Sequence, residues 1–286
     1  MKKFYIIANL DKDPELNIST GVAEYLINHG ASCECVGIER KYDDPKQCET
    51  IMNAVCDDTE CVIVIGGDGT FIQVAAYMSK REIPMIGINL GRLGFLAEIE
   101  QDKINDTMDM LLEDKCFVEK RMMIHGRASS QKAGVIECTA LNDVVITRVG
   151  ELCVIPYEIY VNDRLLTSYN ADGIIVSTPT GSTGYSMSAG GPIVEPPSSI
   201  MVITPISAHT FNSRSIVLSA DDKVRIRIGK KNSSQPVSAL MSADGGSSVT
   251  LTDGDYVDIQ KAKEVTSVIK TQNVSFIDIL ARKMSS

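Results

Sequence analysis

A single carboxylate stands among three glycines in this chain. The run Gly66-Gly67-Asp68-Gly69-Thr70 follows directly on the apolar residues 61–65. Free backbone N–H groups in a glycine turn between a strand and a helix attract anionic phosphate. Asp68 itself repels phosphate, so we expect it to accept a proton or a hydrogen bond from a hydroxyl, or to hold a metal. The alternative is a plain Asp-Gly turn, but three glycines after an apolar run favour the chemical interpretation.

A second polar stretch covers residues 177–192 and follows the apolar residues 174–176. Seven of the twelve residues from 177 to 188 are Ser or Thr, and Tyr185 adds an aromatic ring. Dense hydroxyls suit a polar ligand held by neutral hydrogen bonds, and they could cap a helix that begins near Thr183. A flexible Ser/Thr-rich loop is the alternative, although linkers of that kind lack a flanking apolar strand.

Asn142-Asp143 is a third polar feature, at the start of the apolar residues 144–146. Alone, such a pair is typical of a turn. Beside a nucleotide, its amide and carboxylate are suited to ribose hydroxyls or an adenine edge. Neither GxxxxGK[ST] nor GxGxxG occurs in the chain, so a nucleotide would be bound by other means.

The first hundred residues alternate between expected strands and helices. Strands are expected at residues 4–8, 32–38, 61–65 and 85–89, and helices at residues 14–29, 45–55 and 70–79. This order predicts an α/β domain with a Rossmann-like parallel sheet. Ligands bind at the carboxyl ends of such strands, where both the Asp68 turn and residues 89–94 are expected to lie.

The pattern of expected secondary structure changes after a further helix expected at residues 104–112. Short strands and turns dominate from residue 117, and residues 224–228 alternate as a half-exposed strand does. This predicts a second, mainly β domain over residues 115–265. The tail predicts a helix over residues 276–284, with Ser275 as its N-cap.

Composition narrows the possible partners. The net charge is −9 over 286 residues, which argues against nucleic acid or an anionic membrane as the main partner. The eight cysteines form no CxxC pair, so neither a zinc site nor a redox motif is indicated, and a reducing cytoplasm is expected. No apolar run approaches the length of a membrane span, and the N-terminal one is too short for a signal peptide.

Three motifs, in this order, resemble the NAD kinase family. They are residues 66–70 with 89–96, residues 141–145, and Asp172-Gly173 with 177–192 and 203–206. The first is shared with lipid kinases, whereas the third is far more specific. The resemblance implies transfer of phosphate from ATP to the 2′-hydroxyl of the adenosine ribose of NAD, giving NADP, with Mg²⁺ or Mn²⁺. It also implies a homodimer or homotetramer and a C-terminal helix that returns to the first domain, so that the domains cover 1–100 with 268–286, and 115–265.

The resemblance also implies roles for individual residues. Asp68 would be the catalytic carboxylate, and Asn142 and Asp143 would contact the adenosine half, with Asp143 standing where the family usually has Glu. Asp172 would face the nicotinamide end, and Ser207 would approach from a neighbouring subunit. The other expected substrate-binding positions are Gly67, Gly69, Asn170, Thr180, Thr183, Gly184, Tyr185, Ser186, Met187, Ser188 and Gly245.

Two other functions remain open from the residues alone. A lipid or sugar kinase could share the glycine turn, but it leaves Asn142-Asp143 and the hydroxyls of 177–188 unexplained. A non-catalytic NAD(P)-binding sensor is the other alternative, and Asp68 argues against it because binding alone needs no carboxylate beside phosphate.

Overall fold

The structure is a computed structural model that describes residues 1–39, 53–91, 94–150, 154–209, 213–230, 237–271 and 275–285. The chain divides into two compact units. Unit 1 comprises Met1–Arg121 and Glu264–Ser286, and unit 2 comprises Met122–Lys263. Each unit is described by itself. Two long strands, β6 (Phe117–Ser130) and β17 (Tyr256–Lys270), have residues in both units.

Unit 1 is an α/β domain built on a parallel sheet. Its strands are β1 (Lys3–Asn9), β2 (Ser32–Ile38), β3 (Cys61–Gly66), β4 (Met85–Asn89) and β5 (Ala97–Ile99), with the order β4-β3-β1-β2 and with β5 paired to β4. All residues of β3 and β4 are buried, as the continuous apolar runs predicted. The expected parallel sheet is therefore confirmed.

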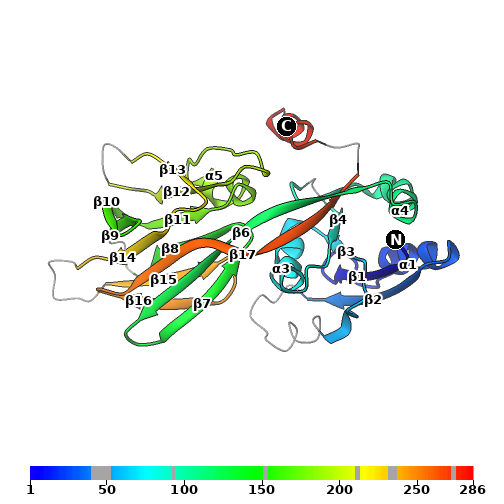
Figure 1. Cartoon of the computed structure of the whole chain (residues 1–286), viewed down its shortest axis with the longest axis horizontal. Helices are drawn as coiled ribbons and strands as arrows, with labels where there is room; N and C mark the ends of the chain where they lie inside the picture. Colours follow the sequence, from blue (N-terminus) through cyan, green and yellow to red (C-terminus); the bar gives the residue numbers. More distant parts are fainter. Residues whose placement is uncertain are drawn as a thin grey trace. The chain divides into compact units, whose positions relative to one another are not determined.

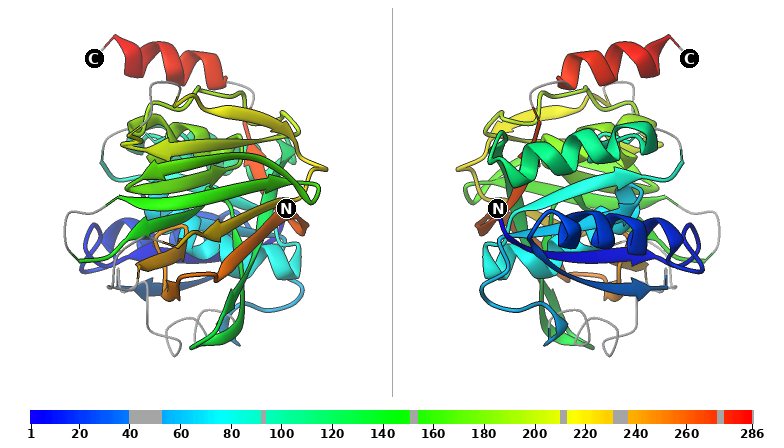
Figure 2. Two further views of the ribbon diagram at one scale, coloured as in Figure 1. Left: turned by 90° about the vertical axis from the view of Figure 1, so that its left-hand side faces the viewer. Right: turned by 90° about the vertical axis from the view of Figure 1, so that its right-hand side faces the viewer.

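The described helices of unit 1 are α1 (Asn17–Asn28), α3 (Asp68–Met78), α4 (Ile104–Leu112) and α6 (Phe276–Met284), with 3₁₀ turns η1 (Ser79–Arg81) and η2 (Gln101–Lys103). Helices α1 and α3 contact strands of this sheet, and α4 contacts α1. In Figure 2, right, the blue helix α1 runs along the blue strands β1 and β2. The helix expected at residues 45–55 lies mainly outside the described residues.

Helix α1 begins three residues later than the expected start at residue 14. The Asp13 carboxylate accepts the N–H groups of Ile18 (3.3 Å) and Ser19 (2.9 Å), and Leu16 adopts the left-handed conformation with φ 56°. The Asp13 side chain thus accepts N–H groups of the first helical turn, and the helix begins only after it. The periodicity of apolar residues could not reveal this later start. Helix α6 begins as expected, because Ser275 and Asp278 form a capping box.

Unit 2 is a mainly β domain, again as expected. One antiparallel sheet has the order β13-β12-β11-β8-β15-β16, and its green and yellow strands run side by side in Figure 2, left. The bounds are β8 (Asp143–Arg148), β11 (Gly173–Ser177), β12 (Ile200–Ile206), β13 (Ile216–Ser219), β15 (Ser238–Ala243) and β16 (Ser248–Thr252).

The second layer of unit 2 contains β7 (Gly134–Ala140), β9 (Ile155–Val161), β10 (Arg164–Ala171) and β14 (Val224–Ile228), together with parts of β6 and β17. One core joins the two layers, because Ile146 and Ile174 of the first share a cluster with Tyr157 and Ile226 of the second. Each fully buried side chain of this size contributes about 1.5–3 kcal/mol. The short elements η3 (Thr180–Thr183) and α5 (Tyr185–Ser188) follow β11, and Figure 1 labels both layers.

Candidate functional site

Three neighbouring strands of unit 1 end in polar residues at one edge of the sheet. Asn9 ends β1, Gly66 precedes the turn after β3, and Asn89 ends β4 in register with Gly66. The Asn9 amide donates a hydrogen bond to Oγ1 of Thr70 (2.8 Å). A side chain at Gly66 would lie 2.7 Å from that same oxygen. Glycine at this position therefore lets the turn close against Thr70.

Asp68 is the first residue of α3, and its carboxylate holds a distant segment of unit 1. Oδ2 accepts the N–H of Phe95 (2.8 Å), and Oδ1 accepts those of Leu96 (3.1 Å) and Ala97 (3.0 Å). Each carboxylate oxygen can accept two hydrogen bonds, so Oδ2 retains one acceptor position. Gly94 permits this approach, because a Cβ there would lie 1.9 Å from Oδ1. The half-buried carboxylate is thus fixed by backbone N–H groups of a segment that the sequence had grouped with the turn, although the bonds themselves were not predicted.

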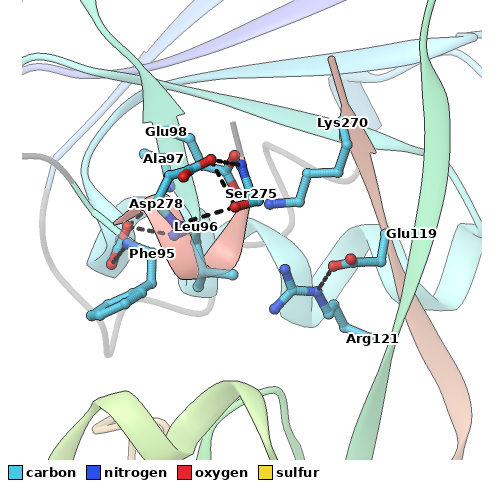
Figure 3. A network of polar contacts seen from close by, with 10 residues as sticks. Phe95, Leu96, Ala97, Glu98, Glu119, Arg121, Lys270, Ser275 and Asp278 are labelled. Atoms are coloured by element: carbon cyan, nitrogen blue, oxygen red, sulfur yellow. Dashed lines mark hydrogen bonds and ion pairs between the residues drawn. The ribbon is translucent and has the colours of Figure 1, made fainter. Parts of the chain in front are cut away.

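A buried cation lies near Asp68. Lys270, at the end of β17, is 9 % exposed and forms an ion pair with Glu98, which is 8 % exposed. Figure 3 shows the Lys270 side chain extending towards Glu98, while Arg121 faces Glu119 in a second ion pair. Burial lowers the pKa of Lys270 to about 8, and the negative charge of Asp68 opposes that shift. Lys270 was not recognised from the sequence.

A cavity of about 170 Å³ opens beside Asp68. Its lining consists of Asn9, Asp11, Lys12, Gly67, Asp68, Gly69 and Thr70. The ammonium of Lys12 lies 3.3 Å from the carbonyl oxygen of Gly66, and it occupies the space next to Gly67 that a side chain would fill. The cavity thus combines a cation with the start of helix α3, both of which favour an anion. A sequence signal existed, because Asp11-Lys12-Asp13 directly follows β1 at this edge.

The Asn142-Asp143 pair in unit 2 is held by Asp244. Oδ2 of Asp244 accepts the N–H of Leu141 (2.7 Å), and Oδ1 accepts those of Asn142 (2.8 Å) and Asp143 (3.0 Å). The backbone N–H of Asp244 donates in return to the Asp143 carbonyl (3.0 Å). Asp244 precedes Gly245, whose φ of +71° closes the turn from β15 to β16. Of these two residues the sequence singled out only Gly245 as a site residue.

Asp143 is a buried carboxyl beside another carboxylate. It is 6 % exposed, and burial, together with the neighbouring charge of Asp244, raises the pKa of Asp143 to about 7. Ser177 lies directly opposite Asp143 across the β8–β11 pair. Two polar atoms here, Oγ of Ser177 and Oδ1 of Asn142, are buried and have no hydrogen-bond partner within the described parts of the chain. Such atoms are costly unless a ligand or water satisfies them.

The hydroxyls that follow β11 mostly bind the protein itself. Thr178 donates to the Leu141 carbonyl (2.6 Å), and Ser182 donates to the Pro179 carbonyl (2.7 Å). The hydroxyls of Ser186 and Thr204 lie 3.1 Å apart, in hydrogen-bonding contact. The expectation that these hydroxyls cap a helix near Thr183 is wrong, because neither η3 nor α5 has a side-chain N-cap. Backbone carbonyls of Leu141 and Pro179 accept the hydroxyls of Thr178 and Ser182 instead.

This stretch packs closely on the Asn142 turn. Thr178 donates its N–H to the Asn142 carbonyl (2.8 Å), and a Cβ on Gly181 would lie 2.1 Å from that oxygen. At Gly184 a Cβ would lie 3.5 Å from Nδ2 of Asn142 and 4.0 Å from Oδ2 of Asp143. The structure thus brings Asn142, Asp143 and Gly184 together, as expected for one binding surface.

The remaining expected site residues of unit 2 differ in exposure. Thr180 and Ser186 are buried, Thr183 is half-buried, and Tyr185, Met187 and Ser188 are exposed. Asp172 forms an ion pair with Arg148, whose Nε lies 2.8 Å from Oδ1. The Asn170 carbonyl accepts the N–H of His209 (2.8 Å), and Ser207 is exposed with φ +46°.

Neither a clustered metal site nor a membrane-spanning helix is found among the described residues. Within that part of the chain, His, Cys, Asp and Glu side chains form no group of three or more that could hold a metal ion. Across the same residues, the helices are all too short or too polar to cross a membrane.

Comparisons with known proteins point to one family. The family description "ATP-NAD kinase N-terminal domain" matches residues 5–116, and "ATP-NAD kinase C-terminal domain" matches residues 141–271. Curated relatives extend over the whole chain. An NAD kinase of Agathobacter rectalis is 40% identical and covers 100% of this chain and 99% of its own. One from Lachnospira eligens is 38% identical, with 99% and 100% covered.

Solved structures share the fold. The yeast NADH kinase complexed with NADH has a TM-score of 0.79 at 20% identity, covering 100% of this chain and 87% of its own. An NAD kinase from Archaeoglobus fulgidus in complex with ATP has a TM-score of 0.77 at 23% identity, covering 99% of each chain.

Proposed function

The chain belongs to the NAD kinase family, and we propose that it transfers the γ-phosphate of ATP to the 2′-hydroxyl of the adenosine ribose of NAD, giving NADP. The observation that carries this proposal is the fixed carboxylate of Asp68. Three backbone N–H groups hold it at the carboxyl edge of a parallel sheet, beside a cavity that also contains Lys12.

Asp68 orients the attacking hydroxyl. Phosphoryl transfer passes through a loose transition state, so positioning and charge neutralisation supply most of the rate acceleration. The remaining acceptor position on Oδ2 takes the hydrogen bond of the 2′-hydroxyl and receives its proton late in the reaction. Because Phe95, Leu96 and Ala97 already fix the carboxylate, little reorganisation is needed when the substrate binds.

Lys12 and the turn from Gly67 to Gly69 neutralise phosphate charge. The Lys12 ammonium lies in the cavity beside Gly67. A divalent metal, Mg²⁺ or Mn²⁺, bound together with ATP would add further positive charge. Among the residues that line the cavity, the Asp11 carboxylate would hold it, because the one remaining acceptor position of Asp68 is assigned to the 2′-hydroxyl. Mg²⁺ bound to a nucleotide commonly uses one or two carboxylates, with phosphate oxygens and water as the other ligands.

Unit 2 supplies groups for the adenosine half of NAD. Oδ1 of Asn142 and Oγ of Ser177 are buried without a partner among the described residues, and both are satisfied when a base or ribose hydroxyl donates or accepts there. Asp143 accepts from ribose hydroxyls. Tyr185 and Met187, exposed by 46% and 42%, offer apolar surface to a base.

The other expected residues keep the roles that the resemblance implies, except that Asp172, Thr180 and Ser186 act in more specific ways. Asp172 acts at the nicotinamide end as part of an ion pair with Arg148. Thr180 and Ser186 are buried and act by shaping the loop, whereas Thr183, Gly184 and Ser188 are more accessible to substrate. Asn170 and Gly245 complete the proposed surface. We also propose a cytoplasmic homodimer or homotetramer in which Ser207 reaches a neighbouring subunit.

The test is a coupled assay with purified protein, ATP, Mg²⁺ and NAD, in which an NADP-specific dehydrogenase reports product. Formation of NADP, with phosphate at the 2′ position by ³¹P NMR, is expected. The Asp68→Ala variant is the matched control for contaminating kinases. If NADP does not form while NAD still binds, the protein is a sensor. Phosphorylation of diacylglycerol or a sugar in place of NAD would mean a different kinase.

A further inference from the structure

The Asp244 side chain is hydrogen-bonded to the turn of residues 141–143, which carries Asn142 and Asp143. Its carboxylate accepts three consecutive backbone N–H groups, those of residues 141–143, at 2.7, 2.8 and 3.0 Å. More than 100 residues of sequence separate donor and acceptor. Hydrogen bonds from N–H groups to a charged acceptor are about twice as strong as neutral ones. The three N–H groups of the turn are therefore held by one side chain from a distant segment.

Resting on the proposed function, we propose that Asp244 is a positioning residue for NAD: it sets the orientation of Asn142 and Asp143 without contacting the reacting atoms. Asn142 and Asp143 both belong to the turn whose N–H groups Asp244 holds. A shift of that turn moves the Asn142 amide and the Asp143 carboxyl together.

The carbonyls of the turn have several partners, whereas its N–H groups depend on the Asp244 side chain: Thr178 donates to the carbonyls of Leu141 and Asn142, and the backbone N–H of Asp244 donates to that of Asp143. On one side, Asn142 supplies its carbonyl to Thr178, and Gly181 lies against the same oxygen. That contact restrains the carbonyl but leaves the N–H groups of 141–143 to Asp244 alone among the described residues. Loss of the carboxylate would leave up to three N–H groups unsatisfied, and the turn would rotate to recover them.

A second carboxylate in the same unit provides a matched control. Asp255, 2 % exposed, accepts the N–H groups of Gln131 (3.0 Å) and Thr252 (2.8 Å). It follows the end of β16, whereas Asp244 precedes its start. Asp255→Asn makes the same chemical change to the same kind of bond at the other end of one strand. A purely structural role for Asp244 predicts equal behaviour of the two variants.

The experiment measures kcat and both KM values for wild type, Asp244→Asn and Asp255→Asn. We expect Asp244→Asn to raise KM for NAD by about 10- to 100-fold, with kcat and KM for ATP within about 3-fold. Asp255→Asn leaves KM for NAD unchanged although it lowers the Tm. Equal KM effects in the two variants, or an unchanged KM in Asp244→Asn, overturn the proposal. A wild type without NAD kinase activity would instead contradict the proposed function.

The pH profile gives an independent readout. The titratable groups that face one another here are Asp143, Asp244 and the Cys138 thiol. Burial raises the pKa of Cys138 to about 11, so the thiol stays neutral, and it raises the pKa of Asp244 to about 6, so Asp244 is charged at pH 7. Loss of the Asp244 charge removes a repulsion that raises the pKa of Asp143. The acid limb of kcat/KM for NAD, near pH 7 in wild type, therefore moves to lower pH in Asp244→Asn. An unmoved limb overturns the proposal.

A conservative variant keeps the test decisive if Asp244→Asn does not fold. Asp244→Glu retains both carboxylate oxygens on a side chain longer by one methylene, so it can hold the N–H groups only in a displaced turn. An intermediate increase in KM for NAD, of about 3- to 10-fold with kcat preserved, is expected. Wild-type KM in this variant overturns the proposal.

Discussion

Asp68 in unit 1 and Asp244 in unit 2 use the same hydrogen-bond pattern. In each case Oδ2 accepts the first N–H of a run of three residues, and Oδ1 accepts the second and third. Each aspartate therefore fixes a segment distant in sequence, and each is itself fixed by it. The pattern alone does not distinguish a catalytic carboxylate from a structural one.

The charges around the two carboxylates do distinguish them. Asp68 interacts with the buried ammonium of Lys270 and shares its cavity with Lys12. Asp244 instead lies beside the carboxyl of Asp143 and raises its pKa. A carboxylate among cations suits a site where phosphate charge and a proton must both be managed. A carboxylate beside a second one suits recognition of hydroxyls, with no place for phosphate.

The largest expected effect comes from Asp68→Asn. The variant loses the charged acceptor for the 2′-hydroxyl, so kcat should fall by about 100-fold or more. Binding of NAD, measured by calorimetry, should stay nearly intact. The control variant Asp102→Asn, at an exposed carboxylate of η2, should leave kcat unchanged. If Asp68→Asn retained most of the kinase rate, Asp68 would not be the catalytic carboxylate, and the proposed functional difference from Asp244 would be wrong.

Lys270→Met tests the cation near Asp68. Removing it leaves Glu98 buried and unpaired, which typically costs about 3–5 kcal/mol of stability. The double variant Lys270→Met/Glu98→Gln should recover most of that loss in urea unfolding. Its kcat should stay about 10-fold low, because the favourable charge near Asp68 is still missing. Full recovery of kcat in the double variant would show that the ion pair is only structural.

Lys12→Met tests the second cation. Loss of its charge should raise KM for ATP by about 5- to 10-fold, the scale of one exposed charge-assisted phosphate contact. KM for NAD should change little. Lys80→Met, which removes an exposed lysine of η1, serves as the control. An unchanged KM for ATP would mean that the cavity beside Asp68 does not receive the phosphates.

Asp143→Asn gives the smallest effect and tests the buried pair of carboxyls, Asp143 and Asp244, in unit 2. The folded pKa of Asp143, about 7, lies above its ordinary value of 3.8. The group therefore contributes its stability below pH 4, and that contribution is lost progressively as the pH rises to 7. Relative to wild type, Asp143→Asn should gain Tm between pH 5 and pH 8, by about 2–4 °C for each kcal/mol of the lost penalty. The exposed Asp163→Asn should show no such pH-dependent gain.

The sequence was most informative where chemistry and local structure coincide. The strand before Gly66 and the edge position of Asn89 follow from apolar runs and glycine placement, and the structure confirms both. The helix was expected to begin at Thr70 and begins two residues earlier, at Asp68. Asn142 and Asp143 alone were typical of a turn, and their proposed role came from the resemblance to the family.

What the sequence could not reveal depends on long-range pairing. Asp68 binds backbone N–H groups 27 to 29 residues away, and Asp244 binds groups more than 100 residues away. Backbone donors carry no residue identity, so no residue type marks them in advance. Lys270 is a single lysine at the end of a strand, and only burial against Glu98 makes it notable.

The hydroxyl-rich stretch shows a second use of such residues. Seven Ser and Thr residues between 177 and 188 predict ligand contacts, but the hydroxyls of Thr178 and Ser182 bind backbone carbonyls, those of Leu141 and Pro179. A loop that turns sharply around glycines exposes carbonyls that need donors. A high density of hydroxyls is therefore typical of a loop that needs internal hydrogen-bond donors as well as of a loop that binds a ligand.

The division of unit 1 into two segments has a consequence for biosynthesis. Residues 122–263 form unit 2 without interruption, whereas unit 1 needs Glu264 and the residues after it. During translation the mainly β unit can fold as soon as it leaves the ribosome, but the α/β unit must wait for the end of β17 and for α6. Lys270 arrives in that last segment. The buried partner of Glu98 is thus made only after the whole of unit 2, and a nascent α/β unit holds that carboxylate uncompensated until then.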